Sequence, residues 1–247
     1  MPKPKSCLVL FDSSAPTPSK QDRADVVSKL AEVVSRTYYA LEDDSIIVNF
    51  ASTSKVDADF LELFRNPHDS QRAENGNGNG NGASAPQSPR ERFAEDERAC
   101  LKLRRSIALD RAAMFTGVSY DGVCLIGDFR GRPGRLEKVE SVVRSLYRLG
   151  RVVAAFGECV DLLRDKLFDG SMALHENHKD GVGICGSEKP AAGLARETDQ
   201  DAWRDANVVT ALVEETSSVE RGCQMLAEAL TTYEDEARRL GRPVGLR

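Results

Sequence analysis

The sequence has no long apolar run, no secretory leader and no excess of positive charge. No stretch approaches the roughly 18–20 apolar residues that cross a bilayer, and the first thirty residues lack the basic-then-apolar layout of a signal peptide. The 247 residues carry a formal net charge of −5, whereas nucleic-acid-binding domains are normally basic. These absences predict an intracellular protein that does not span a membrane and has no nucleic-acid partner.

Cysteine pairs and catalytic motifs are missing as well. None of the six cysteines forms a Cys-x-x-Cys pair, so we expect reduced thiols in a cytosol-like compartment. Cys100, Cys159 and Cys223 fall on apolar helical faces, where cysteine is usually a small hydrophobic residue. The chain has no P-loop, no Ser/His/Asp nucleophile motif and no carboxylate pair of suggestive spacing. We therefore predict that it is not an enzyme and holds no cofactor or metal.

Two partial motifs lie in one glycine-rich segment. Gly181-Val182-Gly183-Ile184-Cys185-Gly186 matches the dinucleotide fingerprint by letter, but the flanking residues predict neither the strand before it nor the helix after it. His175, Glu176 and His178 could gather a zinc ion with Cys185, yet the second ligand pair of a structural site is absent. A three-ligand catalytic zinc site stays open as a lesser alternative.

A third partial motif follows the first apolar run. Asp12-Ser13-Ser14 stands directly after the strand-like segment 7–11, as in von Willebrand-type metal sites. That motif has a second serine two positions later, where this chain has Pro16. We therefore do not predict a metal site there.

Helical periodicity dominates the rest of the sequence. Helices are predicted at 20–41, 90–116, 135–169 and 199–240, and together they cover more than half of the chain, above the usual third. The fold class is therefore predicted to be mainly α, an elongated helical bundle built on the two long helices 135–169 and 199–240.

The domain boundaries follow composition. Residues 1–67 form an N-terminal helical region with candidate short strands at 7–11 and 46–50. Residues 68–89, with four tandem Asn-Gly pairs, are predicted to be a flexible linker. Residues 90–247 form the helical bundle domain, which has a third candidate strand at 123–127 and a Gly-rich loop at 170–197.

The two long helices carry the strongest pattern, apolar residues spaced alternately three and four apart. Such a heptad seam needs a partner helix. The seam consists of Val139, Val142, Leu146, Leu149, Val153, Phe156, Val160, Leu163, Leu167, Val209, Leu212, Val219, Leu226 and Leu230. We therefore predict a non-enzymatic helical scaffold or structural subunit that binds other subunits or itself. An α/β enzyme built on the three strand segments is a further alternative, and one parallel sheet flanked by helices would contradict the scaffold.

The predicted helix 90–116 suggests a competing function. It is amphipathic and basic, and its segment Lys102–Arg111 resembles the Lys-Leu-x-x-Ser-apolar-x-x-x-Arg segment of the peroxin family that elongates and divides peroxisomes, peroxin eleven. Asp22-Arg23, Glu158–Arg164 and Trp203 are similar to other short elements of that family, in the same order.

The resemblance implies a protein that remodels the peroxisome membrane from its surface. It implies that the basic side chains contact anionic lipid headgroups, namely Arg98, Lys102, Arg104, Arg105 and Arg111. The sequence departs from the family at 199–240, which is polar-faced where the family has apolar membrane segments.

Overall fold

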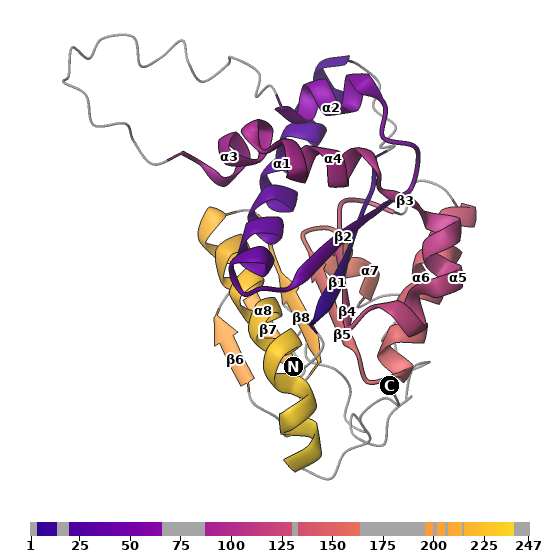
Figure 1. Ribbon diagram of the computed structural model, residues 1–247, viewed down its shortest axis with the longest axis vertical. Coiled ribbons are helices and arrows are strands. Elements are labelled where there is room, and N and C mark those ends of the chain that lie inside the picture. The colour runs from indigo at the N-terminus through magenta and orange to yellow at the C-terminus, as the bar shows by residue number, and fades with distance from the viewer. Residues whose placement is uncertain are drawn as a thin grey trace, which may run out of the picture.

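The computed structural model describes residues 4–13, 20–65, 87–129, 133–163, 196–199, 202–205, 207–213 and 215–239. Its centre is one mixed β-sheet covered by helices on both faces (Figure 1). The strands are β1 (Ser6–Phe11), β2 (Ile47–Ser52), β3 (Ile107–Ala108), β4 (Gly122–Ile126), β5 (Val152–Phe156), β6 (Arg196–Asp199), β7 (Ala202–Asp205) and β8 (Val208–Ala211).

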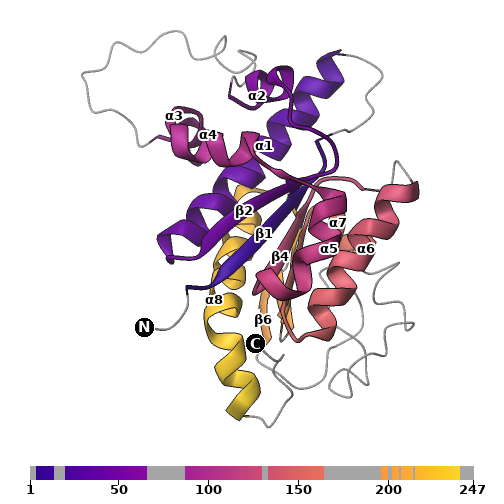
Figure 2. The same cartoon turned by 45° about the vertical axis from the view of Figure 1, so that its right-hand side comes forward.

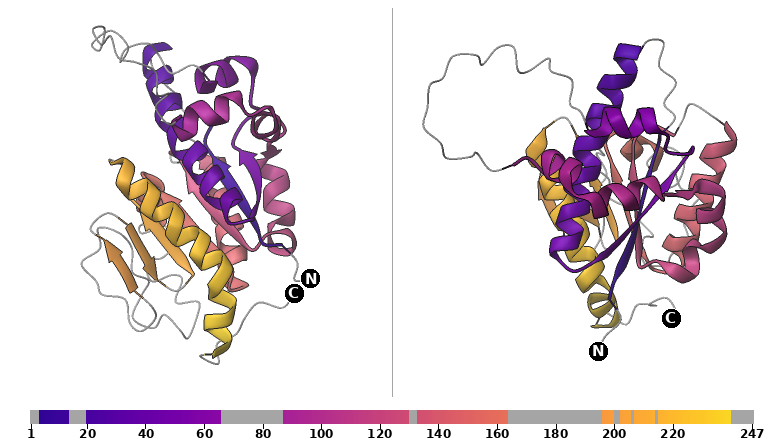
Figure 3. Two further views of the ribbon diagram at one scale, coloured as in Figure 1. Left: turned by 60° about the vertical axis from the view of Figure 1, so that its left-hand side comes forward. Right: turned by 45° about the horizontal axis from the view of Figure 1, so that its top comes forward.

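The sheet order is β3-β2-β1-β4-β5-β8-β7-β6. The first six strands in this order are parallel, and β7 and β6 continue the sheet as antiparallel strands. Figure 3 shows β6 and β7 at one edge of the sheet, beyond β8. Strands β1, β4 and β5 are buried along their whole length, which is the pattern of parallel strands covered on both faces.

One helical layer consists of α1 (Lys20–Asp43), α2 (Ala58–Arg65), α3 (Pro89–Glu95), α4 (Glu97–Arg104) and α8 (Thr216–Arg239). Its apolar side chains share one buried cluster with one face of the sheet. The other layer consists of α5 (Leu109–Ser119), α6 (Pro133–Arg148) and α7 (Cys159–Leu162), which pack on the opposite face (Figure 2).

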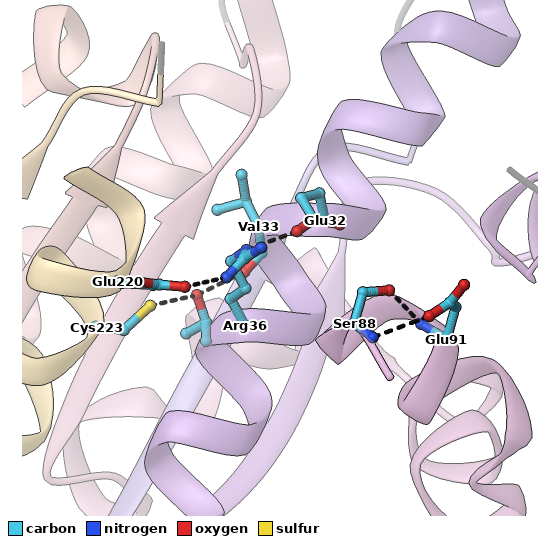
Figure 4. A network of polar contacts seen from close by, with 8 residues as sticks. Glu32, Val33, Arg36, Ser88, Glu91, Glu220 and Cys223 are labelled. Atoms are coloured by element: carbon cyan, nitrogen blue, oxygen red, sulfur yellow. Dashed lines mark hydrogen bonds and ion pairs between the residues drawn. The ribbon is translucent and has the colours of Figure 1, made fainter. Parts of the chain in front are cut away.

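Helices α1 and α8 lie side by side in the first layer and are joined by polar contacts (Figure 4). Arg36 of α1 forms ion pairs with Glu32, across 2.6 Å, and with Glu220 of α8. Deeper in the interface, the Thr37 Oγ1 lies 3.5 Å from the Cys223 Sγ.

At the start of α3, Ser88 and Glu91 form a reciprocal capping box, which satisfies free amides of the first turn.

The prediction of a mainly α-helical bundle is wrong, because the chain has an α/β fold with a six-stranded parallel core. The predicted helix 135–169 is divided into α6, β5 and α7 within the described residues. Gly150, with φ +64°, lies just beyond the end of α6, and the five residues of β5 are all buried. A strand that is apolar at every position satisfies any spacing, so the heptad pattern ran through it unbroken.

The predicted helix 199–240 is also wrong before residue 216, where α8 begins. Strands β7 and β8 occupy part of that segment, and only α8 is helical. The coiled-coil interpretation therefore fails for both segments. The three candidate strands at 7–11, 46–50 and 123–127 are present as β1, β2 and β4 and belong to one parallel sheet, the arrangement that contradicts the scaffold.

The predicted helix 90–116 is broken into α3, α4, β3 and α5. Asp96 ends α3, and its carboxylate accepts hydrogen bonds from the amides of Arg98 and Ala99 to begin α4. A side chain that caps a new helix turns the chain at that point.

The sheet contains strands from both sides of the predicted linker 68–89. Most of that linker lies outside the described residues. Among the described residues, no helix combines the length and apolarity that a membrane span requires.

Candidate active site

The chain reverses its direction of travel across the sheet between β1 and β4. From β1 it proceeds to β2 and β3 on one side, and then returns to β4 on the other side. In open α/β sheets, ligands bind outside the carboxyl ends of the strands at such a switch point. The residues that directly follow β1, β4 and the strands next to them therefore form the candidate site.

Asp12 follows β1 and is almost fully buried, with 8% of its surface exposed. Its amide donates a hydrogen bond to the carbonyl of Ile126, across 3.2 Å, and its Oδ1 accepts one from the Thr53 hydroxyl at the end of β2. A buried carboxylate is tolerated when it is hydrogen-bonded in this way. Asp12 is thus held between the ends of β2 and β4.

Gly127 follows β4 and lies directly against Asp12. Its φ is +107°, a conformation that favours glycine. A Cβ built on Gly127 would lie 3.3 Å from the Asp12 Cβ. Glycine thus allows the backbone after β4 to approach the carboxylate residue closely.

Cys159 reaches the same glycine from β5. It stands at the start of α7, is 1% exposed, and its Sγ donates a hydrogen bond to the Gly127 carbonyl across 2.8 Å. Asp12 and Cys159 therefore contact one residue, Gly127, from two different strands. By their chemistry, a carboxyl group can serve as a general acid–base and a thiol as a nucleophile.

A tight turn at Gly157 leads from β5 to Cys159. Gly157 has φ +65°, its amide donates to the Ala211 carbonyl across 2.8 Å, and its carbonyl accepts from Val160 across 2.9 Å. The first bond ties the turn to the end of β8, and the second closes the turn onto the start of α7. The thiol is therefore placed by backbone contacts on both sides.

Four serines extend the site toward β3. Ser13 follows β1, Ser52 and Ser54 stand at the end of β2, and Ser106 precedes β3. Their side chains are joined by hydrogen bonds of 2.7–3.1 Å to each other and to the Ser54 backbone. We call these four residues the serine cluster.

Of the sites considered from sequence, only one falls in this region. The sequence places Asp12 and Ser13 directly after a strand, in a pattern that lacks the second serine of a metal motif. The apolar spacing predicts that Cys159 is a small hydrophobic residue on a helical face; it is buried, but its thiol donates to the Gly127 carbonyl of the candidate site. The glycine fingerprint 181–186 and the histidines near 175 lie outside the described residues. No group of three metal-binding side chains occurs in the part of the chain that the structure describes.

The predicted heptad seam is distributed over several elements. The seam residues of α6 and α7 belong to the buried cluster on one face of the sheet and those of α8 to the cluster on the other face, while β5 contributes residues to both clusters. Buried members are Val139, Val142, Leu146, Val153, Phe156, Val160, Leu163, Val209, Val219, Leu226 and Leu230. Leu149 and Leu212 are partly buried, and Leu167 lies outside the described residues. Contact of this seam with a partner helix stays a prediction.

The predicted headgroup-contacting residues lie on α4 and α5 and on the turn between them. Arg98, Arg104, Arg105 and Arg111 are exposed, whereas Lys102 forms a 2.6 Å ion pair with Glu42. Contact of these residues with an anionic surface stays a prediction.

No protein-family model matches the chain, and no curated protein sequence matches it significantly. Among solved structures, the chain is similar to glyoxalase III of Candida albicans, with a TM-score of 0.53 and 13% identity over 91% of this chain and 97% of that one. It also matches the DJ-1beta protein of Drosophila melanogaster, with a TM-score of 0.39, 14% identity, and coverage of 97% and 99%. A DJ-1 superfamily protein of Salmonella typhimurium gives a TM-score of 0.45, 12% identity, and the same coverage.

These similarities correct the functional predictions made from sequence. The resemblance to peroxin eleven is wrong, because no family model matches the chain and its α/β fold is shared with a glyoxalase III. The non-enzymatic scaffold depended on a helical bundle, and both it and the prediction of no enzyme are contradicted by the shared fold with a glyoxalase III. At 13% identity, the similarity establishes that this chain has the glyoxalase III fold.

Proposed function

We propose that the protein is an enzyme that acts on small carbonyl compounds at the carboxyl ends of β1, β4 and β5. The observation that carries this proposal is that Asp12 and Cys159 both lie against Gly127: a Cβ built on Gly127 would lie 3.3 Å from the Asp12 Cβ, and the Cys159 Sγ donates to the Gly127 carbonyl. The shared fold with a glyoxalase III suggests the substrate class, the two-carbon dialdehyde glyoxal and its relatives.

In the proposed reaction, Cys159 is the nucleophile. Its thiol adds to one aldehyde carbon of glyoxal, and the thiol proton passes to the aldehyde oxygen, which gives a hemithioacetal. The thiol of an unactivated cysteine is a weak nucleophile at neutral pH and needs a nearby base. Asp12 supplies the carboxylate that accepts and returns the proton.

Asp12 then moves a second proton. It removes the hydrogen from the hemithioacetal carbon, and a proton is returned to the neighbouring carbon, which leaves a thioester of glycolic acid on Cys159. Water hydrolyses the thioester, so that glyoxal and water become glycolic acid and the free thiol is restored. One carbon is oxidised from the aldehyde to the acid level and the other is reduced from the aldehyde to the alcohol level, so the reaction needs no external oxidant or reductant.

The test is to incubate the full-length protein with glyoxal and to follow glycolate by proton NMR. We expect turnover by the wild type and its loss in Cys159→Ala and Cys159→Ser. Asp12→Asn should lower kcat by about 100-fold or more, the usual contribution of a positioned acid–base group.

Cys100→Ser is the matched control. Cys100 is also buried, and its Sγ also donates to a backbone carbonyl, that of Phe93 across 3.3 Å, but it lies outside the candidate site. This variant should keep wild-type turnover. Absence of glycolate with the wild type, or full turnover by Cys159→Ala, would overturn the proposal.

A further inference from the structure

Thr53 directly follows β2 and contacts three consecutive residues at the end of β1. Its amide donates to the Phe11 carbonyl across 3.3 Å, its hydroxyl oxygen accepts from the Ser13 amide across 3.2 Å, and the same hydroxyl hydrogen-bonds the Asp12 Oδ1. The first two contacts fix Thr53 on both sides of Asp12. The hydroxyl is therefore held at the carboxyl group by the backbone of the neighbouring strand.

The direction of the hydrogen bond between Thr53 and Asp12 follows from the chemistry of the two groups. An ionised carboxylate has no proton and only accepts hydrogen bonds, so the Thr53 hydroxyl is the donor whenever Asp12 acts as a base. The Ser13 amide has only a proton to offer, so it donates to that hydroxyl. The Thr53 hydroxyl thus accepts from a backbone amide and donates to a carboxylate oxygen, and hydrogen bonds in such a chain strengthen one another.

The contact restrains a torsion that the backbone leaves soft. The Asp12 amide is held by the Ile126 carbonyl across 3.2 Å, but the χ2 torsion of an aspartate, which sets the plane of the carboxyl group, has a broad distribution. Threonine is β-branched and therefore stiff at χ1. A hydroxyl on this stiff side chain, bonded to Oδ1, fixes the direction of the Asp12 carboxyl group itself.

The orientation of the carboxylate bears directly on proton transfer. A general base must lie within about 2.6–3.2 Å of the atom that gives up its proton, and a small misplacement of a reacting group lowers the rate steeply. A carboxyl group that turns about χ2 spends part of its time outside that geometry. Thr53 can therefore affect the reaction through Asp12 without touching the substrate.

We propose that Thr53 is a positioning residue, whose hydroxyl orients the Asp12 carboxylate for the proton transfers of the proposed reaction. This inference rests on the proposed function and adds to it a residue that acts through Asp12. The hydroxyl group is the essential feature, and the size of the side chain is secondary. Removing the hydroxyl should slow the chemical step and leave substrate binding unchanged.

The kinetic test follows glycolate formation from glyoxal by the full-length protein. Thr53→Val replaces the hydroxyl with a methyl group of similar size. We expect kcat to fall about 10- to 30-fold, less than the roughly 100-fold contribution of the acid–base group itself, with KM within about twofold of wild type. Thr53→Ser keeps the hydroxyl and should keep kcat within about threefold of wild type.

The Asp12→Asn background separates positioning from a general structural effect. When one residue acts through another, the effects of removing both are not additive. In Asp12→Asn, the further change Thr53→Val should therefore lower the residual kcat by less than about twofold. A loss as large as that in the wild-type background would show that Thr53 acts independently of Asp12, and would overturn the inference.

Thr37→Val is the matched control. Thr37 is a buried threonine of α1 whose hydroxyl also donates to a protein oxygen, the Val33 carbonyl across 2.8 Å, but it lies outside the candidate site. This variant should keep the wild-type kcat and KM. Unfolding midpoints of all variants, measured in urea, separate a lost contact from a lost fold.

The outcomes distinguish this inference from the proposed function. If the wild type forms glycolate, full turnover by Thr53→Val, or a Thr53→Ser variant as slow as Thr53→Val, overturns the positioning role alone. A rise in KM without a fall in kcat also overturns it, because Thr53 would then contribute to substrate binding. If the wild type forms no glycolate, the proposed function is overturned and the positioning role with it.

Discussion

Gly157 and Val213 leave no room for a side chain at the turn after β5. A Cβ built on Gly157 would lie 2.7 Å from the Val213 Cγ2, and Gly157 has φ +65°. In α/β hydrolases, a sharp strand-to-helix turn of this kind carries the nucleophile. Here that position has no side chain, and the thiol available at the site belongs to Cys159, two residues further along the chain.

We expect Gly157→Ala to destabilise the protein by about 2–4 kcal/mol, the sum of a left-handed backbone cost and a steric clash. In that background, Val213→Ala should remove the clash and recover part of the loss, leaving the backbone cost of about 1–2 kcal/mol. Urea unfolding of the two single variants and the double variant measures both contributions.

Gly134→Ala is the control for this cycle. Gly134 lies near the start of α6, and a Cβ there would meet nothing within 4 Å. Alanine should be neutral or stabilising at this position, because it restricts the unfolded chain more than glycine does. A Gly157→Ala variant as stable as Gly134→Ala would contradict the described turn.

Phe93 and Met114 are both apolar residues of the predicted amphipathic helix 90–116, but they differ sharply in burial. Phe93 is fully buried in a cluster with Tyr38, Phe50 and Phe64, whereas Met114 is 77% exposed. We expect Phe93→Ala to cost about 3–5 kcal/mol and Met114→Ala less than about 0.5 kcal/mol. Similar costs in denaturant unfolding would contradict this placement.

The buried thiol of Cys223 should make stability depend on alkaline pH. Burial raises the pKa of Cys223 from 9.0 to about 12, although the Thr37 hydrogen bond and Arg36 oppose the shift. The folded state keeps the Cys223 thiol proton to a higher pH than the unfolded state does. The contribution of this thiol to the free energy of unfolding is therefore fully present below pH 9 and is lost as pH rises from 9 toward 12.

Comparison of wild type with Cys223→Ala isolates this effect from other alkaline changes. Above pH 9, the free energy of unfolding of the wild type should fall, relative to that of Cys223→Ala, by about 1.4 kcal/mol per pH unit. Unfolding curves at pH 7, 9 and 10.5 measure it. A difference that does not change with pH would contradict the neutral buried thiol.

Elements with a clear local pattern were predictable from sequence. The amphipathic helix predicted at 20–41 is α1, and the three strand segments are β1, β2 and β4. Strand β5 was not predictable in the same way. All of its residues are buried, so it has neither the alternation of a half-buried strand nor a boundary that interrupts the helical spacing around it.

The candidate site, too, was predictable from sequence only in part. The sequence by itself determined that Asp12 follows a short apolar strand and that Cys159 stands in an apolar environment, because both properties depend on neighbouring residues. Only the tertiary structure decided that β1 pairs with β4 and β4 with β5, which brings Asp12 and Cys159 to Gly127. Strand order depends on burying both faces of the whole sheet beneath helices from distant parts of the chain, and local periodicity carries no information about that order.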